Sequence, residues 1–135
     1  MDKLVEQAVK ARKHAYVPYS GFKVGAAVQS KSGRIYTGCN IENASYGLSN
    51  CAERTAIFKA VSEGEDQFIA IAVVADTPGP VSPCGACRQV MSEFGIEKII
   101  LTNLRGEQQV LTIEEILPFS FAKGDVRKDG EKNNE

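Results

Sequence analysis

The sequence predicts a three-layer α/β/α domain, in which helices cover both faces of one mixed five-stranded sheet. The main observation is that helical and strand-like apolar patterns follow each other in the order α-β-β-α-β-α-β-β-α. The second is the composition of the 135 residues, 43% hydrophobic and 24% charged, which is typical of a globular domain. We expect one domain over residues 1–121, followed by a polar, flexible tail over residues 122–135.

The first half of the chain predicts a helix, a hairpin and a second helix. Apolar residues recur at helical spacing over residues 3–15, and "VPYSG" then breaks the pattern. Two strand-like runs, over residues 22–30 and 34–41, are joined by the turn signal "KSG". The segment "CAERTAIFKAVSE" predicts a helix over residues 51–63, which Gly64 ends.

The second half predicts three strands and two helices. The strands cover residues 68–75, 98–102 and 108–111, and the helices cover residues 84–94 and the stretch before Pro118. The first of these strands is continuously apolar, as expected when both of its faces are covered. Thr112 and Glu115 form a capping-box pattern that opens the last helix.

The charge pattern excludes several kinds of partner. The formal net charge is −1, so nothing favours binding to nucleic acid or to a membrane surface. No apolar run approaches the length that spans a membrane, and the charged, amphipathic start of the chain differs from a signal peptide. We therefore expect a cytoplasmic protein whose four cysteines stay reduced.

One pair of cysteines, in "VSPCGACRQV", lies where a helix is expected to begin. Ser82 suits the N-cap and Pro83 the first helical position, so Cys84 and Cys87 fall on one helix face. The positive end of the helix dipole favours thiolates there by about 0.3–1 kcal/mol. The pair alone fits a zinc site, a redox couple or two inert thiols.

A third cysteine favours the metal. In "SNCAERTA", Asn50 is the expected N-cap of a second helix and Cys51 lies in its first turn. Three thiolates with one open coordination position are typical of a catalytic zinc site. Glu53 follows in the same turn, either as a catalytic carboxylate or as the capping-box partner of Asn50. Cys39 is either a buried thiol or the fourth ligand of a closed, structural site.

The Cys-x-Glu and Pro-Cys-x-x-Cys motifs together match the known signature of zinc deaminases. The chain resembles the small, three-cysteine, homotetrameric cytidine deaminases from about Lys10 to Phe121. The segments that carry the resemblance are "YVPYSGFKVGAA", "GCNIENASY", "NCAERTA" and "GPVSPCGACRQV". The resemblance implies a cytidine deaminase-like fold, one zinc ion per chain, a pyrimidine nucleoside substrate and a homotetramer.

The implied reaction is hydrolytic deamination of cytidine and 2′-deoxycytidine to uridine and 2′-deoxyuridine, with release of ammonia, in pyrimidine salvage. Zinc held by Cys51, Cys84 and Cys87 lowers the pKa of a bound water toward about 7, so that it attacks C4 of the base. Glu53 moves the protons. Since three thiolates and Zn²⁺ carry a net charge of −1, we expect Arg54 and Arg88 to compensate beside the sulfurs.

Substrate contacts are assigned mainly through the resemblance. The expected contacts are Phe22, Asn40, Glu42, Tyr46, Ala52 and Phe121. Asn40 and Glu42 alternate on the predicted strand, so both side chains face the same way, and the resemblance assigns them to the ribose 3′-hydroxyl. It also assigns Phe22 to the base pocket, the Ala52 N–H to O2 of the base, and Phe121 to a neighbouring subunit's site. Tyr46 is a further candidate for a cross-subunit contact.

Three other functions remain as alternatives at this point. A blasticidin S deaminase shares the metal motif and the size, but lacks the "NIEN" pattern present here. A nucleic-acid deaminase needs a basic groove or a stacking platform, and the sequence shows neither. A structural zinc module with Cys39 as fourth ligand binds zinc without turnover. Release of ammonia from cytidine separates these alternatives.

Overall fold

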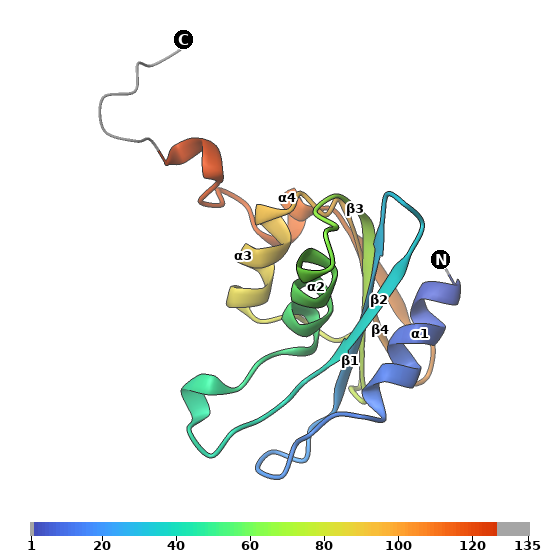
Figure 1. Cartoon of the computed structure of the whole chain (residues 1–135). Helices are drawn as coiled ribbons and strands as arrows, with labels where there is room; N and C mark the ends of the chain where they lie inside the picture. Colours follow the sequence, from blue (N-terminus) through green and yellow to red (C-terminus); the bar gives the residue numbers. More distant parts are fainter. Residues whose placement is uncertain (1, 127–135) are drawn as a thin grey trace.

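The protein folds around one five-stranded sheet with the strand order β2-β1-β3-β4-β5 (Figure 1). The computed structural model describes residues 2–126. The strands are β1 (Val24–Ser30), β2 (Ile35–Cys39), β3 (Phe68–Ala75), β4 (Lys98–Asn103) and β5 (Gln108–Leu111). Only β3 and β4 pair in parallel, and the other three pairings are antiparallel. The sheet is therefore mixed, as the sequence predicts.

Helices cover both faces of this sheet. They are α1 (Asp2–Arg12), α2 (Ala52–Ser62), α3 (Gly85–Glu93) and α4 (Ile113–Ile116). Figure 1 shows α1 on one side of the sheet, and α2 and α3 side by side on the other. The three-layer α/β/α architecture predicted from the sequence is confirmed. No helix within residues 2–126 has the length and apolar character needed to cross a bilayer.

The two faces of the sheet differ in how they are packed. Under α1 the buried strand residues are mostly small, with Ala27, Ala70 and Ala72 against Leu4 and Ala8. The other face buries larger side chains of β3, β4 and α3, including Ile71, Ile99, Met91 and Val73. Burying a side chain of this size contributes about 1.5–3 kcal/mol. The larger core thus anchors the layer that carries the cysteine-bearing helices.

Two glycines let helices approach the sheet closely. A Cβ atom on Gly38 would lie 2.5 Å from the backbone nitrogen of Ala56 and 2.7 Å from the carbonyl oxygen of Ala52. A Cβ on Gly25 would lie 2.1 Å from the carbonyl oxygen of Ala8, in α1. Gly38 therefore sets how near the first turns of α2 come to β2.

Several element boundaries differ from the sequence prediction by a few residues. The first helix ends at Arg12 instead of residue 15. In the hairpin, β1 begins after Phe22 and β2 ends before Asn40. Thr112 and Glu115 form the predicted capping box, with backbone-to-side-chain distances of 2.9 and 3.2 Å. Of the tail predicted for residues 122–135, Lys123–Asp125 form a 3₁₀ turn, and residues 127–135 lie outside the described range.

Candidate active site

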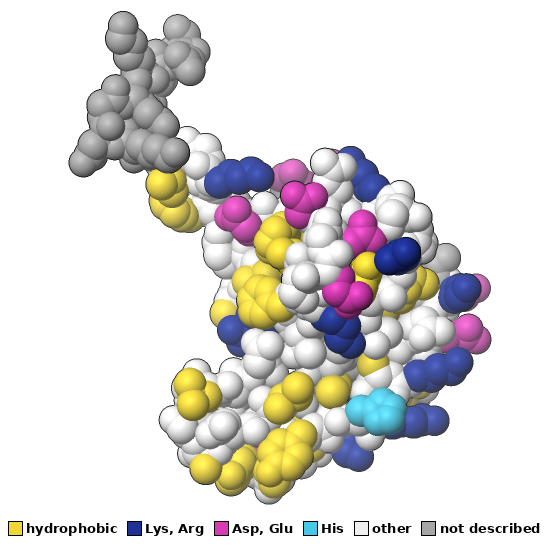
Figure 2. Space-filling view, viewed as in Figure 1, with side chains coloured by type: hydrophobic (Ala, Val, Ile, Leu, Met, Phe, Trp, Pro, Cys, Tyr) yellow, Lys and Arg dark blue, Asp and Glu magenta, His cyan; other side chains and the backbone are white. Residues whose placement is uncertain are grey.

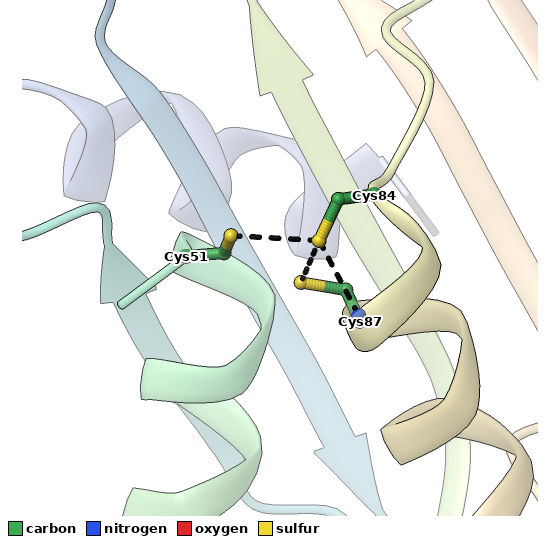
Figure 3. Close-up of side chains that lie close together, drawn as sticks. All are labelled: Cys51, Cys84 and Cys87. Atoms are coloured by element: carbon green, nitrogen blue, oxygen red, sulfur yellow. Dashed lines mark hydrogen bonds between the residues drawn. The ribbon is translucent and has the colours of Figure 1, made fainter. Parts of the chain in front are cut away.

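Three thiols meet between the starts of α2 and α3 (Figure 3). The Sγ atom of Cys84 lies 3.6 Å from that of Cys51 and 3.2 Å from that of Cys87, and all three sulfurs lie within 4.8 Å of one another. Sulfurs bound to one tetrahedral zinc at about 2.3 Å are separated by about 3.8 Å. The donor set and its spacing therefore fit a zinc ion, with a fourth position left for water or substrate.

The helices begin later than the sequence predicts. Cys51 and Cys84 themselves occupy the N-cap positions, with extended backbones, instead of Asn50 and Ser82, and Pro83 lies outside α3. The Sγ atom of Cys84 accepts a hydrogen bond from the backbone nitrogen of Cys87 at 3.4 Å. An N-cap side chain projects beyond the helix end, toward the unpaired N–H groups. This position aims both sulfurs at the space between the two helices.

Among residues 2–126, one arginine donates a hydrogen bond to a sulfur of the cluster. The Arg54 guanidinium donates to Cys51 Sγ at 3.3 Å. The pKa of the Cys51 thiol is lowered to about 5, first by a hydrogen bond from Cys87 and further by Arg54 and Cys84. The pKa of Cys87 is raised, because it donates that bond and is buried. Negative charge is thus stabilised within the cluster, as binding of a cation requires.

Glu53 is almost fully buried, with 3% of its surface exposed, next to this cluster. Burial raises the pKa of its carboxyl group, and the negative charge of Cys51 acts in the same direction. The alternative role as capping-box partner is not formed, since no side chain caps α2. The side-chain amide of Asn50 donates to Thr55 Oγ1 at 3.2 Å instead. A buried carboxylate without a capping role is available for proton transfer.

A cavity of about 220 Å³ opens beside Glu53. Its lining joins the two helix starts to the loops that precede β1 and follow β2: Phe22, Val24, Asn40, Cys51, Ala52, Glu53, Val81, Ser82 and Cys84. Of the predicted base contacts, Phe22 is 44% exposed on its wall and Ala52 is fully buried at the first position of α2. The cavity therefore brings an aromatic ring, a carboxylate and two thiols around one space.

Asn40 and Glu42 lie beyond the end of β2, so the prediction that both sit on that strand is wrong. Ile41 between them bridges Tyr16 and Asn50, which keeps this segment extended. Asn40 accepts from the Val24 nitrogen at 2.9 Å and donates to the Phe22 carbonyl oxygen at 2.7 Å. Its amide keeps one N–H and one lone pair for a ligand.

Glu42 and Tyr46 border a neighbouring cavity of about 330 Å³, lined by Tyr19, Ser20, Glu42, Tyr46 and Ser49. Tyr46 is 74% exposed, and its ring meets that of Tyr19 edge-on, with centroids 5.8 Å apart. Glu42 thus lines one cavity and Asn40 the other. Exposed apolar side chains gather on this end of the molecule, over the loops that carry Tyr19 and Tyr46 (Figure 2).

Arg88 does not lie where charge compensation would need it. Its guanidinium donates to the carbonyl oxygens of Pro83 and Ile116, at 3.0 and 2.7 Å, and to Ser82 Oγ at 2.7 Å. These bonds tie the loop before Cys84 to the end of α4, because their acceptors belong to both segments. Arg88 therefore positions a cysteine-bearing loop and donates no hydrogen bond to a thiol among the described residues.

Phe121 lies on the surface, with 63% of its area exposed. Its carbonyl oxygen accepts from Gln89 Nε2 at 2.6 Å, which fixes its backbone to α3. The ring joins neither hydrophobic core of the described chain. An aromatic side chain held in this way is available to a partner.

Cys39 is not part of the metal-binding cluster within residues 2–126. Burial raises the pKa of its thiol, as in an inert cysteine. The closed four-cysteine site is therefore not formed.

Sequence reasoning missed Ser20, Ser82 and Val81, which border the two cavities. All three lie within the segments "YVPYSGFKVGAA" and "GPVSPCGACRQV", but nothing in those segments distinguishes them as cavity-lining residues.

Known proteins resemble this chain in both sequence and fold. Residues 1–103 match the cytidine and deoxycytidylate deaminase zinc-binding region. A cytidine deaminase from Sporosarcina psychrophila is 57% identical over 128 residues, covering 93% of this chain and 94% of that protein. A cytidine deaminase from Halalkalibacterium halodurans is 58% identical over 125 residues, covering 91% and 95%. The crystal structure of a cytidine deaminase from Burkholderia pseudomallei superimposes with a TM-score of 0.86 at 52% identity, covering 89% of this chain and 98% of that one.

The α/β/α fold and the three-thiol cluster define a zinc-dependent hydrolytic deaminase. Within that class, the chain belongs to the cytidine and deoxycytidylate deaminase family, since the family's zinc-binding region spans most of its length. Its cofactor is zinc, for which the cluster offers one site per chain, and this confirms the cofactor predicted from the sequence.

Proposed function

We propose that this enzyme hydrolyses cytidine and 2′-deoxycytidine to uridine and 2′-deoxyuridine, releasing one ammonia per nucleoside. The observation that carries the proposal is the buried carboxylate of Glu53, which borders the same cavity as two of the three clustered thiols. The two cytidine deaminases that are 57% and 58% identical to the chain support the choice of nucleoside. Such an activity serves pyrimidine salvage, in the cytoplasm.

Glu53 is the proton carrier of the proposed reaction. A Zn²⁺ ion held by Cys51, Cys84 and Cys87 supplies a Lewis acid that makes water nucleophilic near neutral pH. The Glu53 carboxylate takes a proton from the attacking water and delivers it to ring N3, so that C4 becomes electrophilic. Glu53 then takes the remaining proton of the added hydroxyl group and passes it to the amino group, so that the C4–N bond breaks, ammonia leaves, C4 becomes a carbonyl and N3 keeps its proton. Burial keeps bulk water away from these transfers.

The walls of the two cavities supply the remaining contacts. Phe22 lies against the base, and the Ala52 N–H, at the start of α2, has no partner inside the helix and meets O2 of the base. Asn40, from the wall of one cavity, and Glu42, from the wall of the other, bracket the ribose 3′-hydroxyl as a donor and an acceptor. This division is supported by the segment of residues 19–24, which contributes Tyr19 and Ser20 to one cavity and Phe22 and Val24 to the other.

We also propose a homotetramer with active sites shared between subunits. Phe121 stacks on a base in the neighbour's site, and Tyr46 contacts the neighbour at the edge of its own cavity. The exposure of both rings supports this assignment, since 63% and 74% of their surfaces remain uncovered in one chain. Large exposed apolar patches commonly mark such interfaces.

The test is ammonia release by the zinc-loaded protein, measured with cytidine, 2′-deoxycytidine, deoxycytidylate and blasticidin S. We expect turnover of the two nucleosides, and the ratio between them is read from the same assay. Deoxycytidylate carries a phosphate for which these two cavities offer no cationic side chain in their linings. Turnover of blasticidin S without cytidine turnover would contradict the proposal.

A further inference from the structure

The carboxylate of Glu42 is held by three donors from one short loop. Its Oε1 atom accepts from the backbone nitrogens of Tyr19 and Ser20, each at 3.1 Å, and its Oε2 atom accepts from the Ser20 hydroxyl. A carboxylate offers about four lone-pair positions. Oε1 is therefore saturated, and the one remaining acceptor position lies on Oε2. The loop fixes both the orientation of the carboxylate and the atom that stays open to a ligand.

The direction of the Ser20 hydrogen bond is settled by its second partner. The Phe22 backbone nitrogen donates to Ser20 Oγ at 3.0 Å. Because that N–H can only donate, the hydroxyl proton is free for Glu42, which as a carboxylate can only accept. The bonds form a chain from Phe22 through Ser20 to Glu42, and hydrogen bonds in such a chain polarise one another. The hydrogen bond from the Ser20 hydroxyl is also the main cause that keeps the pKa of Glu42 below its usual range.

We propose that Ser20 is a positioning residue, whose hydroxyl orients the Glu42 carboxylate toward the sugar 3′-hydroxyl and couples it to the base-pocket wall at Phe22. The inference rests on the proposed nucleoside deaminase function and extends it to a residue that does not itself touch the substrate. Because Glu42 serves the sugar and not the reacting carbon, Ser20 acts on substrate binding more than on the chemical step.

A purely structural role for Ser20 in its turn does not account for these contacts. The turn is closed by a backbone hydrogen bond from Gly21 N to Val17 O, at 3.0 Å, which needs no side chain. The Ser20 hydroxyl instead reaches a residue 22 positions further along the chain. Its loss therefore leaves the backbone bond that closes the turn in place, whereas the Glu42 carboxylate keeps only the two donors on Oε1 and its Oε2 atom is no longer fixed.

The test compares Ser20→Ala and Ser20→Thr with the wild-type holoenzyme, on cytidine and on 3′-deoxycytidine. A hydrogen bond to a charged group is worth roughly tenfold or more in binding. We expect Ser20→Ala to raise KM for cytidine about tenfold while kcat stays within about twofold. KM for 3′-deoxycytidine, which lacks the hydroxyl that Glu42 binds, should stay near the wild-type value. Ser20→Thr, which keeps the hydroxyl, should restore KM for cytidine.

A matched control exists on the far hairpin turn. There the Ser32 hydroxyl donates to Glu65 Oε2 at 2.6 Å, so Ser32→Ala removes the same kind of bond away from both cavities. This variant should leave KM unchanged for both nucleosides. If Ser20→Ala fails to fold, as judged by zinc content and thermal melting, Ser20→Cys takes its place as a weaker donor.

A double-mutant cycle with Glu42→Gln supplies the decisive readout. If Ser20 acts through Glu42, Ser20→Ala should change KM little in the Glu42→Gln background. Additive effects, an equal rise in KM for both nucleosides, or an unchanged KM for cytidine would overturn the role of Ser20 while leaving the proposed function intact. A wild-type enzyme that fails to release ammonia from cytidine would overturn the proposed function itself, and the role of Ser20 with it.

Discussion

The Arg54 guanidinium donates a hydrogen bond to the Cys51 sulfur across 3.3 Å, while its own Nε atom is buried without a partner among the described residues. Desolvating a guanidinium and leaving one of its donors unpaired costs free energy. The cost is offset if the cation faces a site of net negative charge, and three thiolates around Zn²⁺ form such a site. Arg54 therefore lies where charge compensation is needed.

We expect Arg54→Ala to lower kcat roughly tenfold or more, in line with the loss of a hydrogen bond to a charged group. Cys51→His removes one negative charge from the ligand set, so the double variant should recover part of that loss. Zinc content and kcat are measured together. Lys59→Ala is the control, because it also removes a cation from α2. The Lys59 ammonium group donates its hydrogen bond to the Thr37 carbonyl oxygen and not to a sulfur. Absence of rescue in a folded, zinc-loaded double variant would contradict the electrostatic role.

Glu53→Gln keeps the shape of the side chain but not its ability to carry a proton. General acid–base catalysis contributes roughly 10²–10⁴-fold, and one group that serves several transfers should reach or exceed that range. We expect kcat to fall by at least 10²-fold with zinc content unchanged, measured by ammonia release and metal analysis. A variant that retains most of its kcat would exclude Glu53 as the proton carrier.

Zinc content distinguishes the ligands from the fourth cysteine. Cys51→Ala should lose both zinc and activity, because a two-thiolate site is left. Cys39→Ala should keep both, since Cys39 lies outside the cluster. Metal analysis after dialysis against a chelator checks the two variants side by side, and release of zinc from Cys39→Ala would restore the closed-site hypothesis.

Gly38→Ala should displace the start of α2 and with it Cys51 and Glu53. The added Cβ overlaps the backbone of Ala52 and Ala56, and overpacking of this kind costs about 1–3 kcal/mol. Gly25→Ala is the matched control, because its Cβ overlaps α1 on the opposite face of the sheet. We expect both variants to lower Tm, but only Gly38→Ala to lower zinc content and kcat per folded molecule. Equal catalytic losses in both would show that α2 is not positioned by this contact.

Phe121→Ala should raise KM, or lower kcat/KM, by about tenfold, because stacking on a nucleobase is worth roughly 1–3 kcal/mol. Mixed assembly tests whether the site is shared. Phe121→Ala chains combined with Glu53→Gln chains create hybrid sites with Glu53 from one subunit and Phe121 from another. Activity should then reappear, and its absence after verified subunit exchange would place Phe121 in its own chain's site.

The order of the elements could be predicted from the sequence because its signals are local. Helical spacing, continuous apolar runs and stops such as Gly64 and Gly95 depend on neighbouring residues, and the structure confirms the five strands and the α/β/α layers. The zinc cofactor was predictable for a similar reason, since C-x-E and C-x-x-C are short spacings with a restricted chemistry.

Contacts between distant loops were decided only by the tertiary structure. Ser20 bonds to Glu42, 22 positions away, and Arg88 bonds to Ile116, 28 positions away. No periodic pattern in the sequence predicts either hydrogen bond. The N-caps of α2 and α3 are Cys51 and Cys84, and not the predicted Asn50 and Ser82, for a related reason. The position of an N-cap depends on where the chain enters its packed layer, as well as on side-chain preference. The sequence by itself determined which groups the site contains, and the packing of α2 and α3 on the sheet decided where each one points.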